Sequence, residues 1–302
     1  MAKVVRHLRD GQMEFQKVFS KLCDTKSSWQ AWSDFVEMTA IAISNRFEIR
    51  EDVKQKREQR YLDIIGQYKK SEQALFPELV AILVQSLERN AEQDFLGEMF
   101  MALELGSHWK GQFFTPYSLC KAMANINTAD AKDKITEKGW VSINDPACGA
   151  GATLIAARNA LDLDGIGYRQ AFFVGQDIDR TAAMMCYIQL SLLGCAGYVV
   201  IADTLIHPLT GPLLWPNLTE YQDAWFMPLN FTDPVWALRW MKSMRTGEDY
   251  EDVTDTSRHE LAKEAQVIEK KENPQEAVQE PPTPPAPDLP LKETEIGQLT
   301  LF

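Results

Sequence analysis

The chain has 302 residues, of which 45% are hydrophobic and 25% charged, and its formal net charge is −12. This length allows one large domain or two modest ones, and the composition is that of an ordinary globular protein. No uncharged apolar run approaches the ~18 residues that a membrane span requires. The charged start of the chain predicts no signal peptide. We therefore expect a cytoplasmic protein that makes no membrane contact.

The negative charge is concentrated at the end of the chain. Residues 246–302 hold 14 acidic and 5 basic residues, a net charge of −9, which leaves −3 for residues 1–245. A nearly neutral folded part can still present a local basic surface, so net charge does not exclude nucleic acid as a partner. The five cysteines form no Cys-x-x-Cys pair. We expect them to be reduced, and we expect no metal site.

Residues 1–110 are predicted to form an α-helical domain. Apolar residues recur at helical spacing in three stretches, residues 13–46, 76–87 and 95–105. Ser27 or Ser28 is suited to cap a helix start within the first stretch. Trp29 and Trp32 follow the same spacing, which favours a place in the core over a platform for stacked bases.

A further helix is predicted over residues 49–68, with Lys54, Lys56, Arg57 and Arg60 along it. Two interpretations remain open for these basic side chains. They form either a solvated charged surface, which we favour, or a contact to the DNA backbone.

The most informative stretch of the chain is Asp145-Pro-Ala-Cys-Gly-Ala-Gly151. A β-rich run precedes it and a helix of small residues follows it. A strand, a glycine turn and a helix start bring backbone close to a ligand at the carboxyl end of a parallel strand. The pattern matches neither a dinucleotide fingerprint nor a phosphate loop. An aspartate ahead of the glycines suits a ligand with a cationic group and hydroxyls.

Two further strands are predicted after this turn, over residues 171–175 and 198–202. Asp177 follows the first and Asp203 follows the second. A carboxylate just past the second strand of such a fold is placed to accept hydrogen bonds from ribose hydroxyls. The alternation of strand and helix predicts an α/β fold with a parallel, Rossmann-like sheet. A fourth strand is expected near residues 224–231.

Upstream of the glycine turn, an aromatic and polar segment leads into a helix at Pro116. Proline is common at the first helical position and threonine is a common cap, so Thr115 is the expected cap of this helix.

Four segments together resemble the modification subunit of type I restriction systems and related adenine-N6 DNA methyltransferases. They are Gly111-Gln-Phe-Phe-Thr-Pro116, Asp145–Gly151, Gly175-Gln-Asp-Ile-Asp179 and Ala202-Asp-Thr-Leu205. They occur in the family's order, and the resemblance covers roughly residues 94–205.

The resemblance implies S-adenosylmethionine as cofactor and a role for each matching residue. Gln112, Phe114 and Thr115 would close over its methionine end. Asp145 would face its ammonium group, while Ala147, Gly149 and Gly151 belong to the turn that lets the backbone approach. Asp177 would bind the ribose hydroxyls, and Asp203 would accept from the adenine amine.

The family's catalytic motif, Asn/Asp-Pro-Pro-aromatic, is missing from the chain. In that motif the Asn or Asp side chain and a proline carbonyl accept the two amine hydrogens of a flipped adenine, and the aromatic ring stacks on the base. The nearest match is Asp233-Pro-Val-Trp236. Asp233, Pro234 and Trp236 are therefore the candidate catalytic residues. The alternative, which the local sequence favours, is a helix capped by Asp233 with Pro234 in its first turn.

The sheet is predicted to be truncated, because only three strands are clear where a complete methyltransferase sheet of this kind has about seven. We expect a helical domain over residues 1–110, a methyltransferase-like core over 111–245 and a disordered, acidic and proline-rich linker over 246–297. An exposed sheet edge requires cover from the helical domain or from a partner chain.

The last five residues form a separate motif, Gln298-Leu-Thr-Leu-Phe302. It resembles the peptide with which bacterial proteins bind the DNA polymerase sliding clamp. Gln298 would bind at the rim of a pocket that Leu299, Leu301 and Phe302 fill. The alternative is an arbitrary apolar terminus.

The resulting hypothesis is an S-adenosylmethionine-dependent adenine-N6 DNA methyltransferase of the restriction-modification type, without a metal. DNA is the expected substrate, and a specificity subunit or second modification subunit and the sliding clamp are candidate partners. The alternative is a catalytically inactive, cofactor-binding interaction module.

Overall fold

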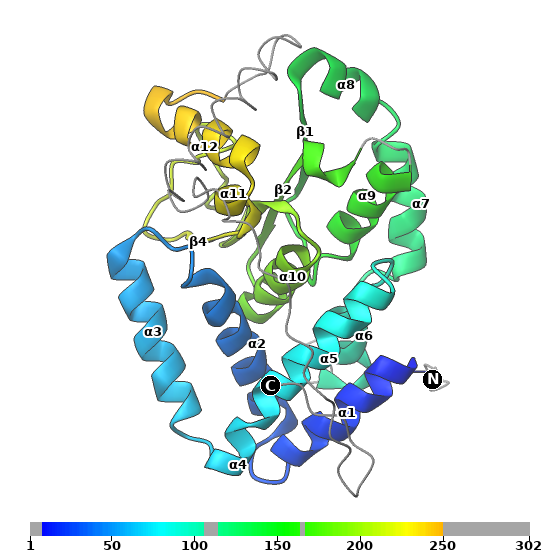
Figure 1. Ribbon diagram of the computed structural model, residues 1–302, viewed down its shortest axis with the longest axis vertical. Helices are drawn as coiled ribbons and strands as arrows, with labels where there is room; N and C mark the ends of the chain where they lie inside the picture. The colour runs from blue at the N-terminus through cyan, green and yellow to red at the C-terminus, as the bar shows by residue number, and fades with distance from the viewer. Residues whose placement is uncertain (1–7, 106–113, 164–166, 250–302) are drawn as a thin grey trace, which may run out of the picture.

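The computed structural model of the protein describes residues 8–105, 114–163 and 167–249. A bundle of helices forms the first part, and a four-stranded sheet with helices on both faces forms the second (Figure 1). None of the helices in these ranges is long and apolar enough to span a membrane.

The bundle contains α1 (Asp10–Leu22), α2 (Ser28–Ser44), α3 (Glu51–Ile65), α4 (Lys70–Gln73), α5 (Leu75–Arg89) and α6 (Phe95–Ala102). Ser27 caps α2 by accepting a hydrogen bond from the backbone N–H of Gln30 at 3.2 Å. The stretch predicted as helical over residues 13–46 is therefore two helices joined by a turn. Trp32 is fully buried, which confirms it as a core residue, and Trp29 is partly buried and packs edge-on against Phe100 at the margin of the same core.

The second part contains α7 (Tyr117–Asn127), α8 (Ala131–Lys138), β1 (Val141–Asp145), α9 (Ala152–Leu163), a 3₁₀ turn (Tyr168–Gln170), β2 (Ala171–Asp177), α10 (Arg180–Leu192), β3 (Ala196–Ile201), β4 (Asp223–Phe226), α11 (Leu229–Thr232) and α12 (Pro234–Thr246). The strand order is β1-β2-β3-β4, with the first three strands parallel. The fourth is short and antiparallel to β3. It ends at Phe226, earlier than predicted, and the chain continues into α11, where the side chain of Asn230 donates to and accepts from the backbone of Gly197.

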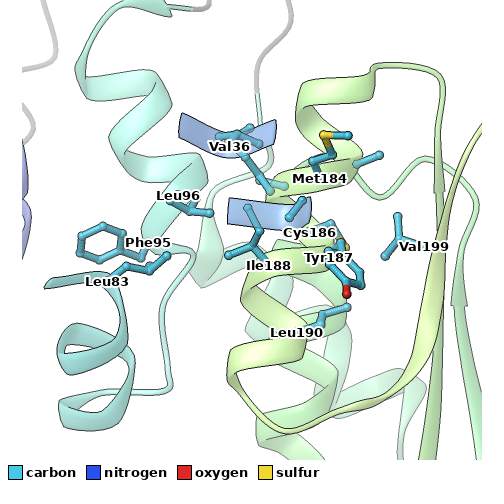
Figure 2. Packing of buried hydrophobic residues seen from close by; sticks show 14 of the residues in the cluster. Val36, Leu83, Phe95, Leu96, Met184, Cys186, Tyr187, Ile188, Leu190 and Val199 are labelled. Carbon is cyan, nitrogen blue, oxygen red and sulfur yellow. The ribbon is translucent and has the colours of Figure 1, made fainter. Parts of the chain in front are cut away.

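The two faces of the sheet are covered differently. α9 and α10 lie on one face, and α2 packs against α10, so the bundle and the sheet share one hydrophobic core. Figure 2 shows this core, with side chains of the bundle helices beside those of α10 and β3: Val36, Leu83, Phe95, Leu96, Met184, Cys186, Tyr187, Ile188, Leu190 and Val199. Trp236 of α12 covers the opposite face, where it packs on Trp140 and Phe172.

The β4 edge of the sheet is closed by the helical bundle. Arg50 and Arg57 donate to the outer carbonyl group of Ala224 at 2.9 and 3.0 Å. Arg57 also forms ion pairs with Glu48 at 3.0 Å and Asp223 at 2.9 Å, and its guanidinium lies 3.5 Å from the centre of the Trp225 ring. Burial favours a higher pKa for the Asp223 carboxyl, but the charges of Arg57 and Arg180 outweigh burial and lower that pKa.

These contacts divide the basic residues of α3. Arg57 is buried at the β4 edge, so neither a solvated surface nor a DNA contact describes it. Arg60 pairs with Glu37 at 2.8 Å. Lys56 is 81% exposed and matches the expected solvated surface.

The β1 edge has a different environment. Among the described strands β1 pairs with β2 alone, and Ser142 and Asn144 are exposed. Within the described ranges, the sheet is therefore open on the side of its first strand.

Candidate functional site

The glycine turn follows β1 as predicted, and its conformation requires glycine. Gly149 has φ +54° and Gly151 has φ +96°, values that residues with a Cβ adopt rarely. A Cβ on Gly149 would lie 3.0 Å from the Phe114 ring, and one on Gly151 would lie 2.8 Å from Cys186 Sγ. The backbone N–H of Cys148 donates to the Gln176 carbonyl at 3.0 Å, which fixes the turn against β2.

Two carboxylates lie at the carboxyl ends of β1 and β2. Asp177 accepts from the backbone N–H groups of Gly149 and Asp179, each at 2.8 Å. Asp145 accepts from the Ala147 N–H at 3.1 Å and from the Thr153 hydroxyl. An ionised carboxylate has about four acceptor positions, so both retain capacity for a ligand.

An inner cavity of about 200 Å³ opens at this turn. It brings together six of the predicted cofactor residues, namely Phe114, Thr115, Asp145, Ala147, Gly149 and Asp177. Asp94 joins them from the start of α6. Three carboxylates and no lysine or arginine therefore line this cavity among the residues that the structure describes. This lining favours a cationic ligand that also donates hydrogen bonds.

A larger cavity of about 540 Å³ adjoins the inner one and shares Asp94, Phe114 and Thr115 with it. It lies among α1, α6 and α7. Its basic side chains are both in ion pairs, Arg9 with Glu98 and Lys121 with Glu92. The two cavities together extend the site from the glycine turn toward the bundle.

Gln189 of α10 joins the bundle to the glycine turn, a role that sequence reasoning missed. This buried side chain donates to Asp94 Oδ1 at 2.8 Å and to the Ala150 carbonyl at 2.9 Å, and it accepts from the Leu96 N–H at 3.0 Å. Asp94 also caps α6 by accepting from the Gly97 N–H at 2.9 Å. Burial raises the pKa of the Asp94 carboxyl to about 6. A lone glutamine in an apolar helix gives no sequence signal for such a contact.

The segment after β3 contributes the next part of the site. Asp203 accepts from the N–H groups of Leu205 and Ile206 at 2.8 and 3.2 Å, so it shapes a turn and does not line the inner cavity. The Thr204 hydroxyl donates to the Pro146 carbonyl at 2.6 Å, which joins this turn to the glycine turn.

Two apolar side chains are exposed beside these acids. Ile178 follows Asp177 and is 66% exposed, and Leu205 is 93% exposed. Sequence reasoning did not single them out, although their positions just after the strand ends carried the signal.

Asp233, Pro234 and Trp236 have the geometry of the helix-cap alternative. Asp233 accepts from the N–H groups of Val235 and Trp236 at 3.0 and 3.1 Å, and Pro234 begins α12. The Trp236 indole is buried and donates to the Arg169 carbonyl at 2.8 Å. Arg169 precedes β2, so α12 begins at the amino end of the strands, opposite the glycine turn.

Among the remaining predicted site residues, Thr115 is described by the structure and the others lie outside the described ranges. Pro116, not Thr115, is the N-cap of α7, and no side-chain hydrogen bond caps that helix. Thr115 lines the inner cavity instead. Gln112 and Gln298, Leu299, Leu301 and Phe302 lie outside the described residues.

Four cysteines are buried, Cys23 is partly buried, and all five are free thiols. No group of three or more metal-ligating side chains gathers in the described ranges.

Comparison with known proteins identifies the family. The sequence profile of the N-6 DNA methylase family matches residues 93–273, which is more than half of the chain. The chain therefore belongs to the N-6 DNA methylase family. The match confirms the resemblance, the α/β methyltransferase fold class and S-adenosylmethionine as the cofactor that accompanies it.

One curated relative is the Type I restriction enzyme MjaIX methylase subunit of Methanocaldococcus jannaschii, 32% identical over 110 residues. The match spans 36% of this chain and 18% of that protein's length.

Two solved structures are more distant. One is a candidate class I S-adenosylmethionine-dependent methyltransferase from Listeria monocytogenes, with TM-score 0.39, 19% identity and coverage of 68% of this chain and 58% of the other. The second is a type I restriction-modification methyltransferase subunit from Streptococcus thermophilus, with TM-score 0.31, 17% identity and coverage of 75% and 55%. These low scores identify no common arrangement of the whole chains.

Proposed function

We propose that this chain binds S-adenosylmethionine in the inner cavity and is the cofactor-binding part of an adenine-N6 DNA methyltransferase of the restriction-modification type, acting in the cytoplasm. The observation that carries the proposal is the cavity of the family's glycine turn, which three carboxylates and no basic side chain line among the residues that the structure describes. When bound, S-adenosylmethionine supplies a methyl group on a sulfonium centre, and it carries an ammonium group and ribose hydroxyls.

The residues at the cavity fit these groups. Asp145 is the partner for the ammonium group, and Asp177 has acceptor capacity for the ribose hydroxyls. Asp203 follows the neighbouring strand and is assigned to the adenine amine. The exposed side chains of Ile178 and Leu205 offer apolar surface to an adenine ring, which explains why they are left uncovered by the protein itself.

We do not assign binding of the target adenine of DNA to Asp233, Pro234 and Trp236. These residues lie at the amino end of the strands, whereas the glycine turn lies at the carboxyl end. A five-residue strand such as β1 is roughly 16 Å long, so about one strand length separates the two. The Asp233 carboxylate is engaged as a helix cap and the Trp236 ring is buried, so neither is available to a flipped base.

A second candidate function follows from the same geometry. A chain that binds the cofactor but has no acceptors for the adenine amine is also suited to be an inactive interaction module. The missing Asn/Asp-Pro-Pro-aromatic motif is the observation that favours it.

Calorimetry with S-adenosylmethionine and the full chain tests the first proposal. Asp177→Asn removes a charged acceptor, so affinity should fall by about tenfold or more, as expected for hydrogen bonds to charged groups. Asp52→Asn on the exposed face of α3 is the matched control and should leave affinity unchanged. Absence of binding to the unaltered chain would contradict the proposal.

Transfer of labelled methyl to unmethylated DNA separates the two functions. Label on adenine N6, from the chain alone or with its partner subunits, supports the enzyme. Cofactor binding without transfer in any assembly supports the inactive module.

Clamp docking is a separate proposal that the sequence alone supports. Deleting Gln298–Phe302 should abolish binding to purified sliding clamp and leave cofactor affinity intact. Unchanged affinity for the clamp would contradict the clamp-docking proposal.

A further inference from the structure

We propose that the open β1 edge is the docking surface for a second polypeptide, which adds a parallel strand beside β1 and brings the acceptors for the adenine amine to the cavity. This rests on the proposed function, because the need for those acceptors follows from adenine methylation. It goes further by naming the surface and what the partner must carry.

The position of the cavity relative to the sheet is the first argument. In doubly wound sheets a ligand binds at the carboxyl end of the strands where the strand order reverses, so strands lie on both sides of it. Here the glycine turn follows β1, and the described sheet continues from β1 in one direction only, through β2 to β4. The β2 side of the cavity is therefore bounded by a strand, and on its other side the described sheet supplies no strand.

The outer surface of α7 is the second argument. Leu119, Met123 and Ile126 are 52%, 41% and 75% exposed and follow one another at helical spacing. The opposite face of α7 packs on α9 through Cys120 and Ala124. An apolar stripe on a helix is ordinarily buried against another element, and an exposed one marks an interaction surface.

The stripe and the edge are parts of one surface. Ile143 of β1 packs against the same cluster of small residues that joins α7 to α9. Figure 1 shows α7 on the side of the molecule where β1 lies, away from β4. A strand added to β1 would extend the sheet toward this stripe.

Residues 250–302 do not fit as the occupant. They are acidic and proline-rich, and they contain no Asn/Asp-Pro-Pro-aromatic sequence. A second copy of this chain fits no better, because it brings the same acids and no amine acceptors.

The proposed occupant is a different polypeptide with defined chemistry. It carries a strand that ends in an Asn or Asp side chain and a proline carbonyl, which accept the two amine hydrogens, followed by an aromatic residue that stacks on the base. Its apolar residues cover the α7 stripe.

Photocrosslinking in the native host tests the surface directly. The full chain is produced with p-benzoylphenylalanine at Met123 or Asn144, and at Leu62 of α3 as a control that is 51% exposed. The first two positions should crosslink one polypeptide that contains an Asn/Asp-Pro-Pro-aromatic sequence, and Leu62 should not.

The crosslinked polypeptide is then purified and mixed with this chain, labelled S-adenosylmethionine and unmethylated DNA. Methyl should reach adenine N6 only when both are present. Met123→Glu should weaken their association at least tenfold, with cofactor affinity of this chain alone unchanged within twofold. Leu62→Glu is the matched control and should change neither.

Several outcomes would overturn the inference. They are no crosslink from Met123 and Asn144, a crosslink to residues 250–302 or to a second copy, the same product from Leu62, or N6 methylation by this chain alone. Each is distinct from failure of the proposed function, which is loss of S-adenosylmethionine binding by the unaltered chain.

Discussion

The two edge strands of the sheet, β4 and β1, differ in how the rest of the described chain covers them. At β4, two arginines of the helical bundle satisfy the outer carbonyl of Ala224, and ion pairs bury their charge. At β1, the edge strand carries exposed polar side chains, and α7 carries an exposed apolar stripe. A sheet edge left bare invites pairing with another chain, and proteins ordinarily cover it. Within the residues that the structure describes, the edge far from the glycine turn is covered and the edge next to it is open, and this is the contrast that the proposed docking explains.

The largest expected effect comes from breaking the closed edge. Arg57→Met leaves Glu48 and Asp223 without their shared partner and the Ala224 carbonyl with one donor fewer. Loss of one member of a buried ion pair lowers the free energy of unfolding by about 3–5 kcal/mol. Urea denaturation measures it, and Lys56→Met, at a side chain that is 81% exposed, is the control. Equal stability of the two variants would show that the edge is held by packing alone.

On the β1 side, the next largest effect concerns the glycine turn. Gln189→Leu leaves the Ala150 carbonyl and the Leu96 N–H unpaired in the interior. Unpaired buried groups lower stability by about 1–3 kcal/mol each. We expect cofactor affinity to fall as well, because the turn loses its contact with α10. Gln59→Leu on the surface of α3 is the control, and calorimetry and urea denaturation are the measurements.

The same region should give the site a pH dependence. The pKa of Asp94 is about 6, so its carboxylate becomes neutral as the pH falls from 7 to 5. A cationic ligand that lowers this pKa by about one unit binds about fivefold more weakly at pH 5 than at pH 7. Stability has the opposite sign. The folded state retains this proton to higher pH than the unfolded state, so the contribution of Asp94 to stability declines as the pH rises toward 6.

Asp94→Asn should remove both trends and retain the cap of α6, since asparagine is also a good N-cap. Calorimetric titrations at several pH values check this. An unchanged pH profile in the variant would assign the dependence to another group.

A smaller effect is expected at the amino end of the strands. Asp233→Ala removes a helix cap and should lower the free energy of unfolding by about 1 kcal/mol. Cofactor affinity, and methyl transfer by the assembled enzyme, should persist. Abolished transfer with an intact fold would restore Asp233 as a catalytic residue.

The smallest effect is expected on the open edge of the isolated chain. Met123→Glu places a charge on a side chain that is already 41% exposed, so stability should change by less than about 0.5 kcal/mol. A large loss would show that the stripe is covered within the chain itself.

The sequence predicted the parts of the fold that depend on local signals. The three parallel strands are continuous apolar or β-rich runs, and the glycine turn is marked by residues that positive φ requires. Asp145 and Asp177 follow strand ends, which places them at one edge of a parallel sheet without further information.

Contacts between distant segments were not predictable in this way. Gln189 and Asp94 are 95 residues apart, and nothing in either local sequence marks their hydrogen bond. The same holds for Arg57, whose partner Asp223 lies 166 residues away and which a single sequence places with the exposed bases of α3. Truncation of the sheet was expected, but only the strand order shows which edge is bare.

In the described part of the chain, the charged side chains that line the inner cavity are all acidic, which has a consequence for turnover by the proposed enzyme. Methyl transfer converts the sulfonium of the cofactor into a neutral thioether, so the product carries one positive charge fewer than the substrate. Asp94, Asp145 and Asp177 attract the first more strongly than the second. A cavity of this kind releases the demethylated product more readily than S-adenosylmethionine, and it limits product inhibition without a conformational change.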